Sequence, residues 1–171
     1  MATTLRRVLA AEREILANLL EKYAHDFSEF DQRDVNQLGL YDDPYLDYYF
    51  TEDNCWAYFI EVDGKLAGFV MVSDYYGSDS RVTDFGIMDF FVMRKYRRSG
   101  VGRRAFSLTL EIHKGRWRLQ YHPKNTASVK FWNSVVSECS GGSYEEIHEY
   151  PGASYPDGSQ ATMIFFDNSK R

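Results

Sequence analysis

Residues 94–104 constrain most strongly what this chain can fold into and bind. They follow an apolar run, residues 87–92, that predicts a strand, and they precede residues 105–113, whose apolar spacing predicts a helix. Between these elements, Gly100 and Gly102 let the backbone approach a bulky ligand without a Cβ atom in the way. A helix that follows such a turn presents free backbone N–H groups at the positive end of its dipole. The segment therefore predicts a binding site for an anion such as a phosphate or pyrophosphate.

The length and composition of the chain favour one compact, folded domain. At 171 residues we expect a single domain over residues 1–171 that buries about 70 % of the surface of the unfolded chain. An aromatic content of 16 % is high, and the apolar fraction is ordinary for a folded protein. The net charge of −5 argues against nucleic acid as a default partner, so the basic segment around Arg97 is a local exception.

The cysteines and the apolar runs bear on metal sites and on location. Cys55 and Cys139 lie far apart and outside any CxxC or His/Cys cluster, so we expect no metal site. No apolar run approaches the ~20 residues that span a bilayer, and residues 1–11 do not form a secretory signal. We therefore expect a cytoplasmic protein with reduced thiols and no membrane partner.

The order of the expected elements indicates a mixed α/β (α+β) fold. Apolar residues at helical spacing predict an amphipathic helix over residues 12–25, and Pro44 with paired aspartates predicts a loop and a short helix within residues 27–50. Asp63-Gly64 is a hairpin signal. We expect a mixed, mostly antiparallel sheet of six to seven strands flanked by about four helices. The remaining expected helices cover residues 102–114 and 126–138, and the strands cover residues 56–62, 66–75, 82–92, 116–121, 144–150 and 161–166.

Several interpretations of the glycine turn are open on the residues alone. In one interpretation, the glycines only bend the backbone into a helix. In another, the surrounding Arg and Lys residues form a patch for nucleic acid, although Tyr96 is the one aromatic residue among them. A dinucleotide-binding GxGxxG motif would need a third glycine, which is missing. A Walker loop would need a Gly-Lys-Ser/Thr ending, which is missing too.

The pattern Arg97-x-x-Gly100-x-Gly102 resembles the R/Q-x-x-G-x-G/A signature of the GNAT superfamily, the acyl-CoA-dependent N-acyltransferases. The resemblance extends over most of the chain, because the strand before the turn, the helix after it and Asn125 ahead of an apolar helix occur in the same order. It implies the GNAT fold, with acetyl-CoA as the acyl donor and no metal.

The resemblance also implies which residues hold the acyl donor. In the family, backbone amides of the loop and of the helix start hold the pyrophosphate, and the exposed edge of a splayed strand pairs with pantetheine. Asn125 is implied to hydrogen-bond the pantetheine arm, although Asn is also a common helix N-cap. Trp132 is expected to pack near the thioester. The implied loop residues are Arg97, Arg98, Ser99, Gly100, Val101, Gly102 and Arg103, and the implied strand edge is Phe90, Phe91 and Val92.

The implied reaction is direct attack of a primary amine on the thioester, with the backbone N–H of Val92 as the donor to the developing oxyanion. Many family members place a tyrosine acid seven residues after the Asn, where this chain has Trp132, whose indole is not a useful acid. Some relatives place a glutamate base five residues before the Asn, where this chain has Gln120. The usual acid and that base are therefore both missing from their positions.

Asp89 is the predicted general base. Aspartate is disfavoured within a strand, and burial among its apolar neighbours would raise its pKa toward a useful range. A hydrogen-bonded structural role for Asp89 is the competing interpretation. His122, just beyond the strand at residues 116–121, is the second candidate, and Tyr121 could relay a proton through water. A water chain without a dedicated base is a further possibility.

The segment between the first helix and the next strand usually forms the acceptor pocket in this family. Carboxylates beside aromatic rings suit an ammonium group through ion pairing and cation–π contact. We therefore predict a cationic amine acceptor, either a small molecule such as a polyamine or amino-sugar, or a basic peptide. The competing interpretation is a solvated acidic loop. The predicted acceptor-binding residues are Asp42, Asp43, Tyr45 and Asp47.

The sequence thus favours an N-acetyltransferase that acts in a ternary complex of protein, acetyl-CoA and amine. One alternative is a non-catalytic acyl-CoA-binding sensor or interaction module of the same fold, which the missing tyrosine and glutamate motivate. Another is a protein that binds RNA or another anion through the basic turn alone. The two C-terminal strands could also support a homodimer.

Overall fold

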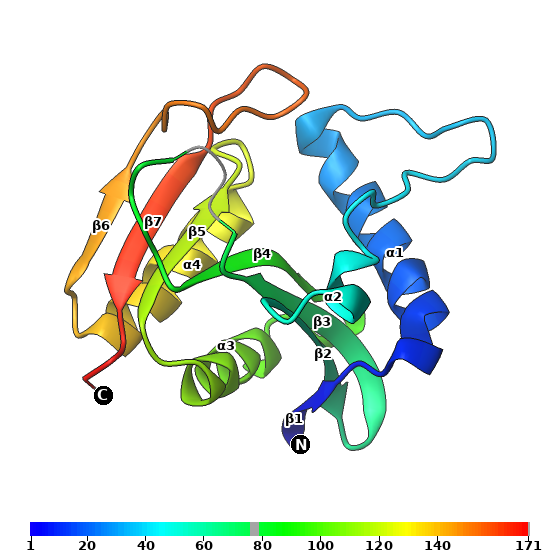
Figure 1. Cartoon of the computed structure of the whole chain (residues 1–171), viewed down its shortest axis with the longest axis horizontal. Helices are drawn as coiled ribbons and strands as arrows, with labels where there is room; N and C mark the ends of the chain where they lie inside the picture. Colours follow the sequence, from blue (N-terminus) through cyan, green and yellow to red (C-terminus); the bar gives the residue numbers. More distant parts are fainter. Residues whose placement is uncertain (76–78, 171) are drawn as a thin grey trace.

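The computed structural model describes residues 1–75 and 79–170, which form a seven-stranded sheet with helices on both faces (Figure 1). The strand order is β1-β2-β3-β4-β5-β7-β6, and every neighbouring pair is antiparallel except β4 and β5. The mixed, mostly antiparallel sheet and the four α-helices confirm the expected fold class. The α-helices are α1 (Arg13–Asp31), α2 (Tyr48–Thr51), α3 (Val101–Ile112) and α4 (Thr126–Ser140), and the strands are β1 (Thr3–Arg7), β2 (Cys55–Val62), β3 (Lys65–Ser73), β4 (Phe85–Val92), β5 (Arg116–Tyr121), β6 (Tyr144–Ile147) and β7 (Thr162–Asp167).

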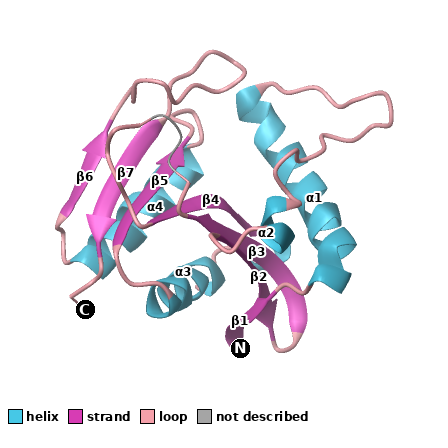
Figure 2. Cartoon of the chain, viewed as in Figure 1, coloured by secondary structure: helices cyan, strands magenta, loops and turns pink. Residues whose placement is uncertain are grey.

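Two apolar clusters hold the helices against the sheet. Alternate residues of β2 and β3 point to opposite faces, as the period of a strand requires. One cluster packs Ile60 and Val70 against α3 and α4, and the other packs Phe59 and Phe69 against α1 and α2. Figure 2 shows the two helical layers on either side of the strands. Within the described residues, no helix is long and apolar enough to cross a bilayer.

Several expected boundaries are wrong. The first strand, β1, was not predicted, and the first helix continues to Asp31 instead of ending near residue 25. The reason is that Phe27 and Phe30 continue the apolar face begun by Tyr23, and the helix stops only where Gln32 adopts a left-handed φ of 63°. The strand expected over residues 82–92 begins at Phe85, and those expected over residues 66–75 and 144–150 end at residues 73 and 147.

The β4 and β5 strands separate in the middle of the sheet. They pair only from Phe85 to Ile87, opposite Trp117 to Leu119. On its other edge, β4 has a register shift that pairs Ile87 with Val72 and Asp89 with Met71, so Met88 is an extra residue. Such a bulge changes the direction in which the following side chains point. The separation leaves the second half of β4 with a free edge.

Gly68 fixes how closely β3 approaches this half of β4. A Cβ atom at Gly68 would lie 1.9 Å from the carbonyl oxygen of Phe91 and 3.0 Å from the Cα atom of Val92. Both are backbone atoms, so no side-chain rotation can relieve the clash. A glycine is therefore required at position 68, where β3 lies closest to the second half of β4.

We expect Gly68→Ala to lower the free energy of unfolding by about 3 kcal/mol or more, because the methyl group forces the two strands apart. Gly64→Ala is the matched control. There a Cβ meets no atom within 4 Å and only the φ of 75° is unfavourable, so we expect a loss of about 1 kcal/mol. Urea unfolding of both variants measures the difference, and equal losses would contradict the close approach seen at Gly68.

Candidate active site

The loop between β4 and α3 offers a row of unpaired backbone donors. The chain leaves a short 3₁₀ turn, Arg94–Tyr96, passes through left-handed conformations at Arg98 (φ 61°) and Gly100 (φ 84°), and enters α3 at Val101. Within the described part of the chain, none of the backbone N–H groups of residues 98–103 has a protein acceptor. Six unpaired donors at a helix N-terminus can bind an anion, and the sequence predicts such a site in this loop.

The two glycines of this loop are required for different reasons. Gly100 has open space around its missing side chain, and its positive φ is what favours glycine. Gly102 lies inside α3, where a Cβ would come within 3.2 Å of the Phe131 ring and 3.7 Å of Val92. Gly100 therefore shapes the turn, and Gly102 allows α3 to pack closely against α4 and β4.

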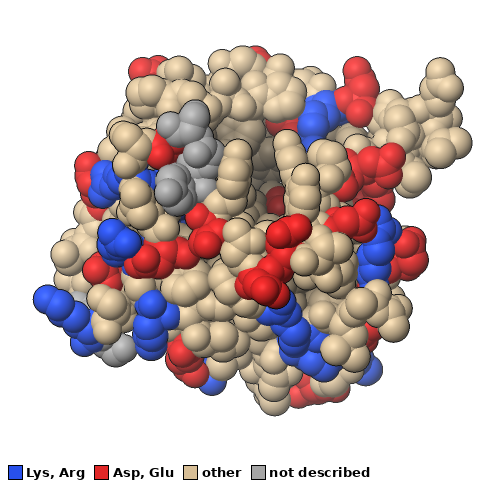
Figure 3. Space-filling view, viewed as in Figure 1, with Lys and Arg blue, Asp and Glu red and all other residues tan. Residues whose placement is uncertain are grey.

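A cleft of about 650 Å³ runs from this loop along the free edge of β4. Its walls come from α1, from β4 with the loop that follows it, and from the start of α4. The space-filling view shows a hollow between α1 and the part of the molecule that contains β5 and β7 (Figure 3). The smaller cavity described below lies between these same two parts. Residues that line the larger cleft include Asp26, Phe90, Phe91, Val92, Arg97, Arg98, Gly100, Gly102, Arg103, Asn125 and Trp132.

The free edge of β4 presents backbone groups of Phe90 and Val92 to the cleft. The N–H of Met93 donates to the carbonyl of Ala67 at 2.8 Å, on the β3 side. Because backbone groups alternate between the two edges of a strand, the N–H and C=O groups of Phe90 and Val92 face away from β3. The Val92 carbonyl accepts a hydrogen bond from Arg97 Nε at 2.7 Å. Among the described residues the Val92 N–H has no acceptor, so it is the donor left free at this position.

Arg97 braces the loop against α1. Its Nη2 lies 2.7 Å from one carboxylate oxygen of Asp26, and Arg94 Nη2 lies 2.8 Å from the other. Burial alone would raise the pKa of Asp26, but hydrogen bonds from the two arginines outweigh it and lower the pKa. Arg97, which begins the signature, thus connects the β4 edge to α1.

The other predicted loop side chains differ in what they contact. The Ser99 hydroxyl donates to the Tyr96 carbonyl at 2.7 Å, and Arg103 pairs with Glu138 on α4. Within the described residues, the Arg98 guanidinium has no ion pair or hydrogen bond. Among these side chains, Arg98 is therefore the one left available to an anion in the cleft.

Asn125 and Trp132 both line the cleft and the smaller cavity next to it. The Asn125 side-chain oxygen accepts the Ser128 N–H at 3.2 Å, which is N-cap geometry, and its amide nitrogen has no partner among the described residues. Trp132 is buried, with its ring centroid 5.1 Å from that of Phe90 and 5.4 Å from that of Phe106. Trp132 thus provides an apolar wall where the two spaces meet.

The smaller cavity has a volume of about 310 Å³ and contains Asp89. The Asp89 side chain is partly accessible from the cavity but is closely surrounded by protein atoms. This burial raises the pKa of Asp89 to about 7, the negative charge of Asp43 adds to the effect, and Tyr23 and Arg33 oppose it. A carboxylate with such a pKa can accept a proton near neutral pH.

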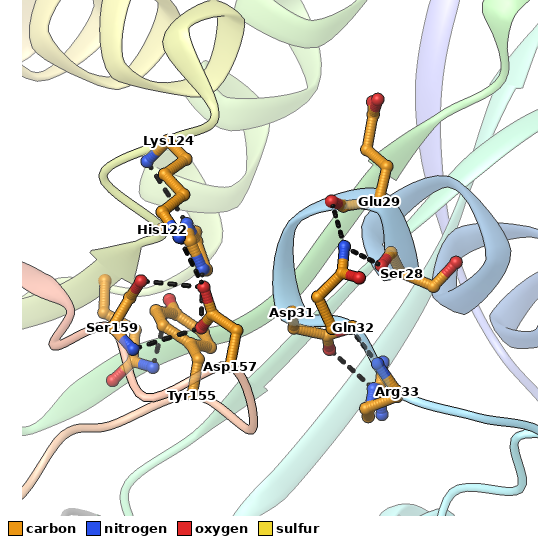
Figure 4. Close-up of polar contacts among 11 residues, drawn as sticks. Ser28, Glu29, Asp31, Gln32, Arg33, His122, Lys124, Tyr155, Asp157 and Ser159 are labelled. Carbon is orange, nitrogen blue, oxygen red and sulfur yellow. Dashed lines mark hydrogen bonds and ion pairs between the residues drawn. The ribbon is translucent and has the colours of Figure 1, made fainter.

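His122 lies in the same cavity but has both ring nitrogens engaged, as Figure 4 shows in part. Its Nδ1 lies 3.2 Å from the backbone N–H of Lys124, which can only donate, so Nδ1 is the acceptor. Its Nε2 therefore carries the proton and donates to Asp157 at 3.1 Å. This arrangement anchors the β6–β7 loop and leaves no ring nitrogen free to accept a proton from a substrate.

Asp157 is the acceptor at the centre of this anchor. Burial would raise the pKa of Asp157, but hydrogen bonds from Ser159, His122 and Lys124 hold the pKa well below its usual range. The Lys124 ammonium lies 3.0 Å from the carboxylate, and the Ser159 hydroxyl lies 2.8 Å from it. The β6–β7 loop is thereby fixed against β5, with Tyr155 facing the cavity.

The predicted acceptor residues lie outside both spaces. The Asp42 carboxylate accepts from Asn36 at 2.8 Å, the Asp43 carboxylate accepts the Tyr45 N–H at 2.8 Å, and Asp47 pairs with Arg13. Of these, Asp43 acts on the cavity through its charge, as its effect on the pKa of Asp89 shows.

The cavity residues that the sequence analysis missed include Asp31, Arg33 and Tyr155. Asp31 and Arg33 follow a helix whose end was predicted too early. Tyr155 lies in a loop with no sequence motif. Within the described residues, no group of three His, Cys, Asp or Glu side chains could hold a metal ion.

Comparison with solved structures gives the same fold at low sequence identity. An acetyltransferase of the GNAT family from Streptococcus agalactiae has a TM-score of 0.68 at 16% identity, with 99% of this chain and 96% of that chain covered. NAA60 from Arabidopsis thaliana, solved with a bisubstrate analogue, has a TM-score of 0.63 at 12% identity and coverages of 97% and 98%. The aminoglycoside acetyltransferase AAC(6')-Ib, solved with coenzyme A, has a TM-score of 0.64 at 13% identity and coverages of 95% and 94%.

The sequence itself matches a family model. No curated protein matches the chain in sequence. The model of the Acetyltransferase (GNAT) family matches residues 16–135, a range that contains the loop, the free β4 edge, Asp89 and Asn125. The chain therefore belongs to the GNAT family of acetyltransferases.

Proposed function

We propose that this protein transfers an acetyl group from acetyl-CoA to a primary amine by direct attack in a ternary complex. The observation that carries the proposal is the row of six unpaired backbone N–H groups, residues 98–103, at the end of a cleft that follows the free edge of β4. The adjoining cavity supplies a carboxylate, Asp89, whose pKa is close to neutral.

The cleft fits the parts of acetyl-CoA in order. The six amides and the free Arg98 guanidinium suit the pyrophosphate, because they place donors and positive charge at a helix N-terminus. The free backbone groups of Phe90 and Val92, with the amide nitrogen of Asn125, suit the pantetheine arm. The thioester then lies near Trp132, where the cleft meets the cavity that holds Asp89.

The residues of the cavity can perform the transfer without a dedicated acid. An alkylamine with a pKa of about 10 is mostly protonated at neutral pH, so Asp89 must first accept a proton from it. The amine nitrogen then forms a bond to the acetyl carbonyl carbon, and the Val92 N–H donates to the oxyanion. The C–S bond breaks as the intermediate collapses, and the nitrogen gives its second proton to the departing thiolate, so that the products are the neutral amide and the CoA thiol. The thiolate is a tolerable leaving group because its pKa is about 8.5, so the tyrosine replaced by Trp132 is not essential.

The acceptor is a small molecule or peptide whose amine reaches the smaller cavity. A free amine is cationic at neutral pH, and the negative charges of Asp89 and Asp43 attract it. Two of the solved proteins with this fold are an aminoglycoside acetyltransferase and a ribosomal-protein-S18-alanine N-acetyltransferase. The fold is therefore compatible with both kinds of acceptor.

A non-catalytic acyl-CoA-binding module is the competing function. Trp132, a buried indole at the junction of the two spaces, favours it because it is not a useful acid. Both functions require the same cleft for acetyl-CoA. They differ in whether an amine causes release of the thiol.

We expect acetyl-CoA to raise the unfolding temperature in proportion to the logarithm of its concentration above Kd, and a thiol-release assay over a panel of amines to show turnover.

Arg98→Glu should weaken acetyl-CoA binding at least about tenfold, because it places a negative charge beside the pyrophosphate. Arg104→Glu, on the same helix but paired with Glu111 outside the cleft, is the matched control. Binding without turnover on any amine would support the sensor instead, and no binding would refute both.

The pH dependence of turnover tests Asp89. We expect kcat/KM of the wild type to rise with pH through about 7, where the Asp89 carboxyl loses its proton, and Asp89→Asn to lower kcat at least about 100-fold. Steady-state kinetics from about pH 5.5 to about pH 8.5, in steps of about one pH unit, measures both effects. An unchanged rate in Asp89→Asn would assign the proton transfer to water.

Loss of the Asp89 proton should raise turnover but lower the free energy of unfolding. The pKa is raised on folding, so the stabilisation from the protonated group is fully present below about pH 4 and is lost as pH rises through 7. Asp89→Asn should therefore gain stability over the wild type with increasing pH, by at most about 1.4 kcal/mol per pH unit. The pKa of Asp157 is lowered in the wild type, so Asp157→Asn should not show such a gain. A constant difference between Asp89→Asn and wild type would contradict the raised pKa.

A further inference from the structure

The smaller cavity contains one cationic side chain among its described lining residues, Arg33, which the proposed transfer does not use. His122 also lines the cavity, but both of its ring nitrogens are engaged. Lys124 lies nearby and pairs with Asp157. Arg33 is therefore the cationic side chain that remains available in the cavity. A role for Arg33 in binding the acceptor rests on the proposed function.

Asp31 supports Arg33 from behind. The Asp31 side chain is 2% exposed and lies at the C-terminal end of α1, where a negative charge is unfavourable. One of its oxygens lies 2.6 Å from Arg33 Nε, and the other accepts the Arg33 backbone N–H at 3.1 Å. A buried carboxylate in such a place is best explained by the cation that it orients.

The outer edge of the Arg33 guanidinium is left unbound. Its Nε makes an ion-pair contact with Asp31 but has no hydrogen-bond acceptor among the described residues. Its guanidinium carbon lies 5.8 Å from the centre of the Tyr41 ring. Within the described residues, its two terminal nitrogens donate to no acceptor, and the side chain is 37% exposed. A guanidinium held in this way matches a carboxylate, which can accept two parallel hydrogen bonds.

Arg33 and Asp89 act on the same small space. The charge of Arg33 lowers the pKa of Asp89 against the effect of burial, so the two groups are electrostatically coupled across the cavity. Figure 4 shows Asp31 and Arg33 on the α1 side, opposite Tyr155 and Asp157 of the β6–β7 loop. The cavity therefore has a base for an amine and a separate donor for an anion.

We infer that the acceptor is a zwitterion, a primary amine that also carries a carboxylate bound by Arg33. A volume of about 310 Å³ suits a molecule of the size of an amino acid. Gln120 and Tyr155, joined by a hydrogen bond of 3.3 Å, form the polar wall opposite Arg33. Burial raises the pKa of Tyr155 to about 12, so its hydroxyl keeps its proton and can donate to the bound acceptor.

The test compares acceptors that differ only in the carboxylate. Each of a panel of free amino acids is assayed for thiol release beside its amide and its decarboxylated amine, with acetyl-CoA at a fixed concentration. We expect kcat/KM for the free acid to exceed that for the amide by about tenfold to 100-fold, the range for a hydrogen-bonded charge pair. The preference should lie in KM, because Arg33 contacts the carboxylate and not the reacting amine.

Variants assign the preference to Arg33. Arg33→Gln alone would leave the buried Asp31 unpaired and could unfold the end of α1, so the double variant Asp31→Asn with Arg33→Gln removes both charges together. We expect this variant to lose the preference for the acid, measured as the ratio of kcat/KM for the free acid to kcat/KM for its amide at one pH, whatever the effect of the lost charge on Asp89 and hence on the rate for all amines. Arg13→Gln, which removes a guanidinium paired with Asp47 outside the cavity, should keep the preference.

The outcomes separate this inference from the proposed function. Turnover of amines or amides at rates equal to or above those of the acids would overturn the zwitterion but leave the acetyltransferase in place. A preference that survives in the double variant would overturn the role of Arg33. Acetyl-CoA binding without turnover of any compound, or no binding, would refute the proposed function and the inference together.

Discussion

The separation of β4 from β5 beyond Ile87 is the constraint on which the rest of this structure depends. A sheet that parts in its middle exposes backbone donors and acceptors that normally pair, and such groups are costly when they lie unpaired in a protein interior. Here they face a cleft, one carbonyl is satisfied by Arg97, and the remaining groups are available to a ligand. The bulge at Met88 and the close approach of Gly68 to Phe91 hold β4 in this position.

The separation also creates two spaces with different electrostatics. At one end, the helix N-terminus and Arg98 favour the anionic part of a ligand. At the other end, burial raises the pKa of Asp89 to about 7. The hydrogen bond between His122 and Asp157 fixes the loop that carries Tyr155. Trp132 lies between them as an apolar wall. A charged cofactor tail and an amine can therefore approach one point from opposite sides without sharing a site.

Features set by short segments could be predicted from the sequence. The strand, the turn through Gly100 and the following helix are local, so their order was predicted correctly, and burial of Asp89 followed from its apolar neighbours. Other features depend on contacts between distant segments. The hydrogen bonds of His122 involve Lys124 and Asp157, which lies 35 residues away in sequence. The pairing of Arg97 with Asp26 spans 71 residues, and the position of Arg33 required the true end of α1. No pattern in the chain encodes these contacts.

The backbone amides of residues 98–103 provide the most direct test of this account. Titration of the 15N-labelled protein with CoA, followed by amide chemical shifts, reports on each of these donors separately. We expect large downfield shifts for several of the six amides and for Val92, and small shifts for amides of β6, none of whose residues lines either space. If CoA binds and these amides keep their shifts, the pyrophosphate lies elsewhere and the proposed site is wrong.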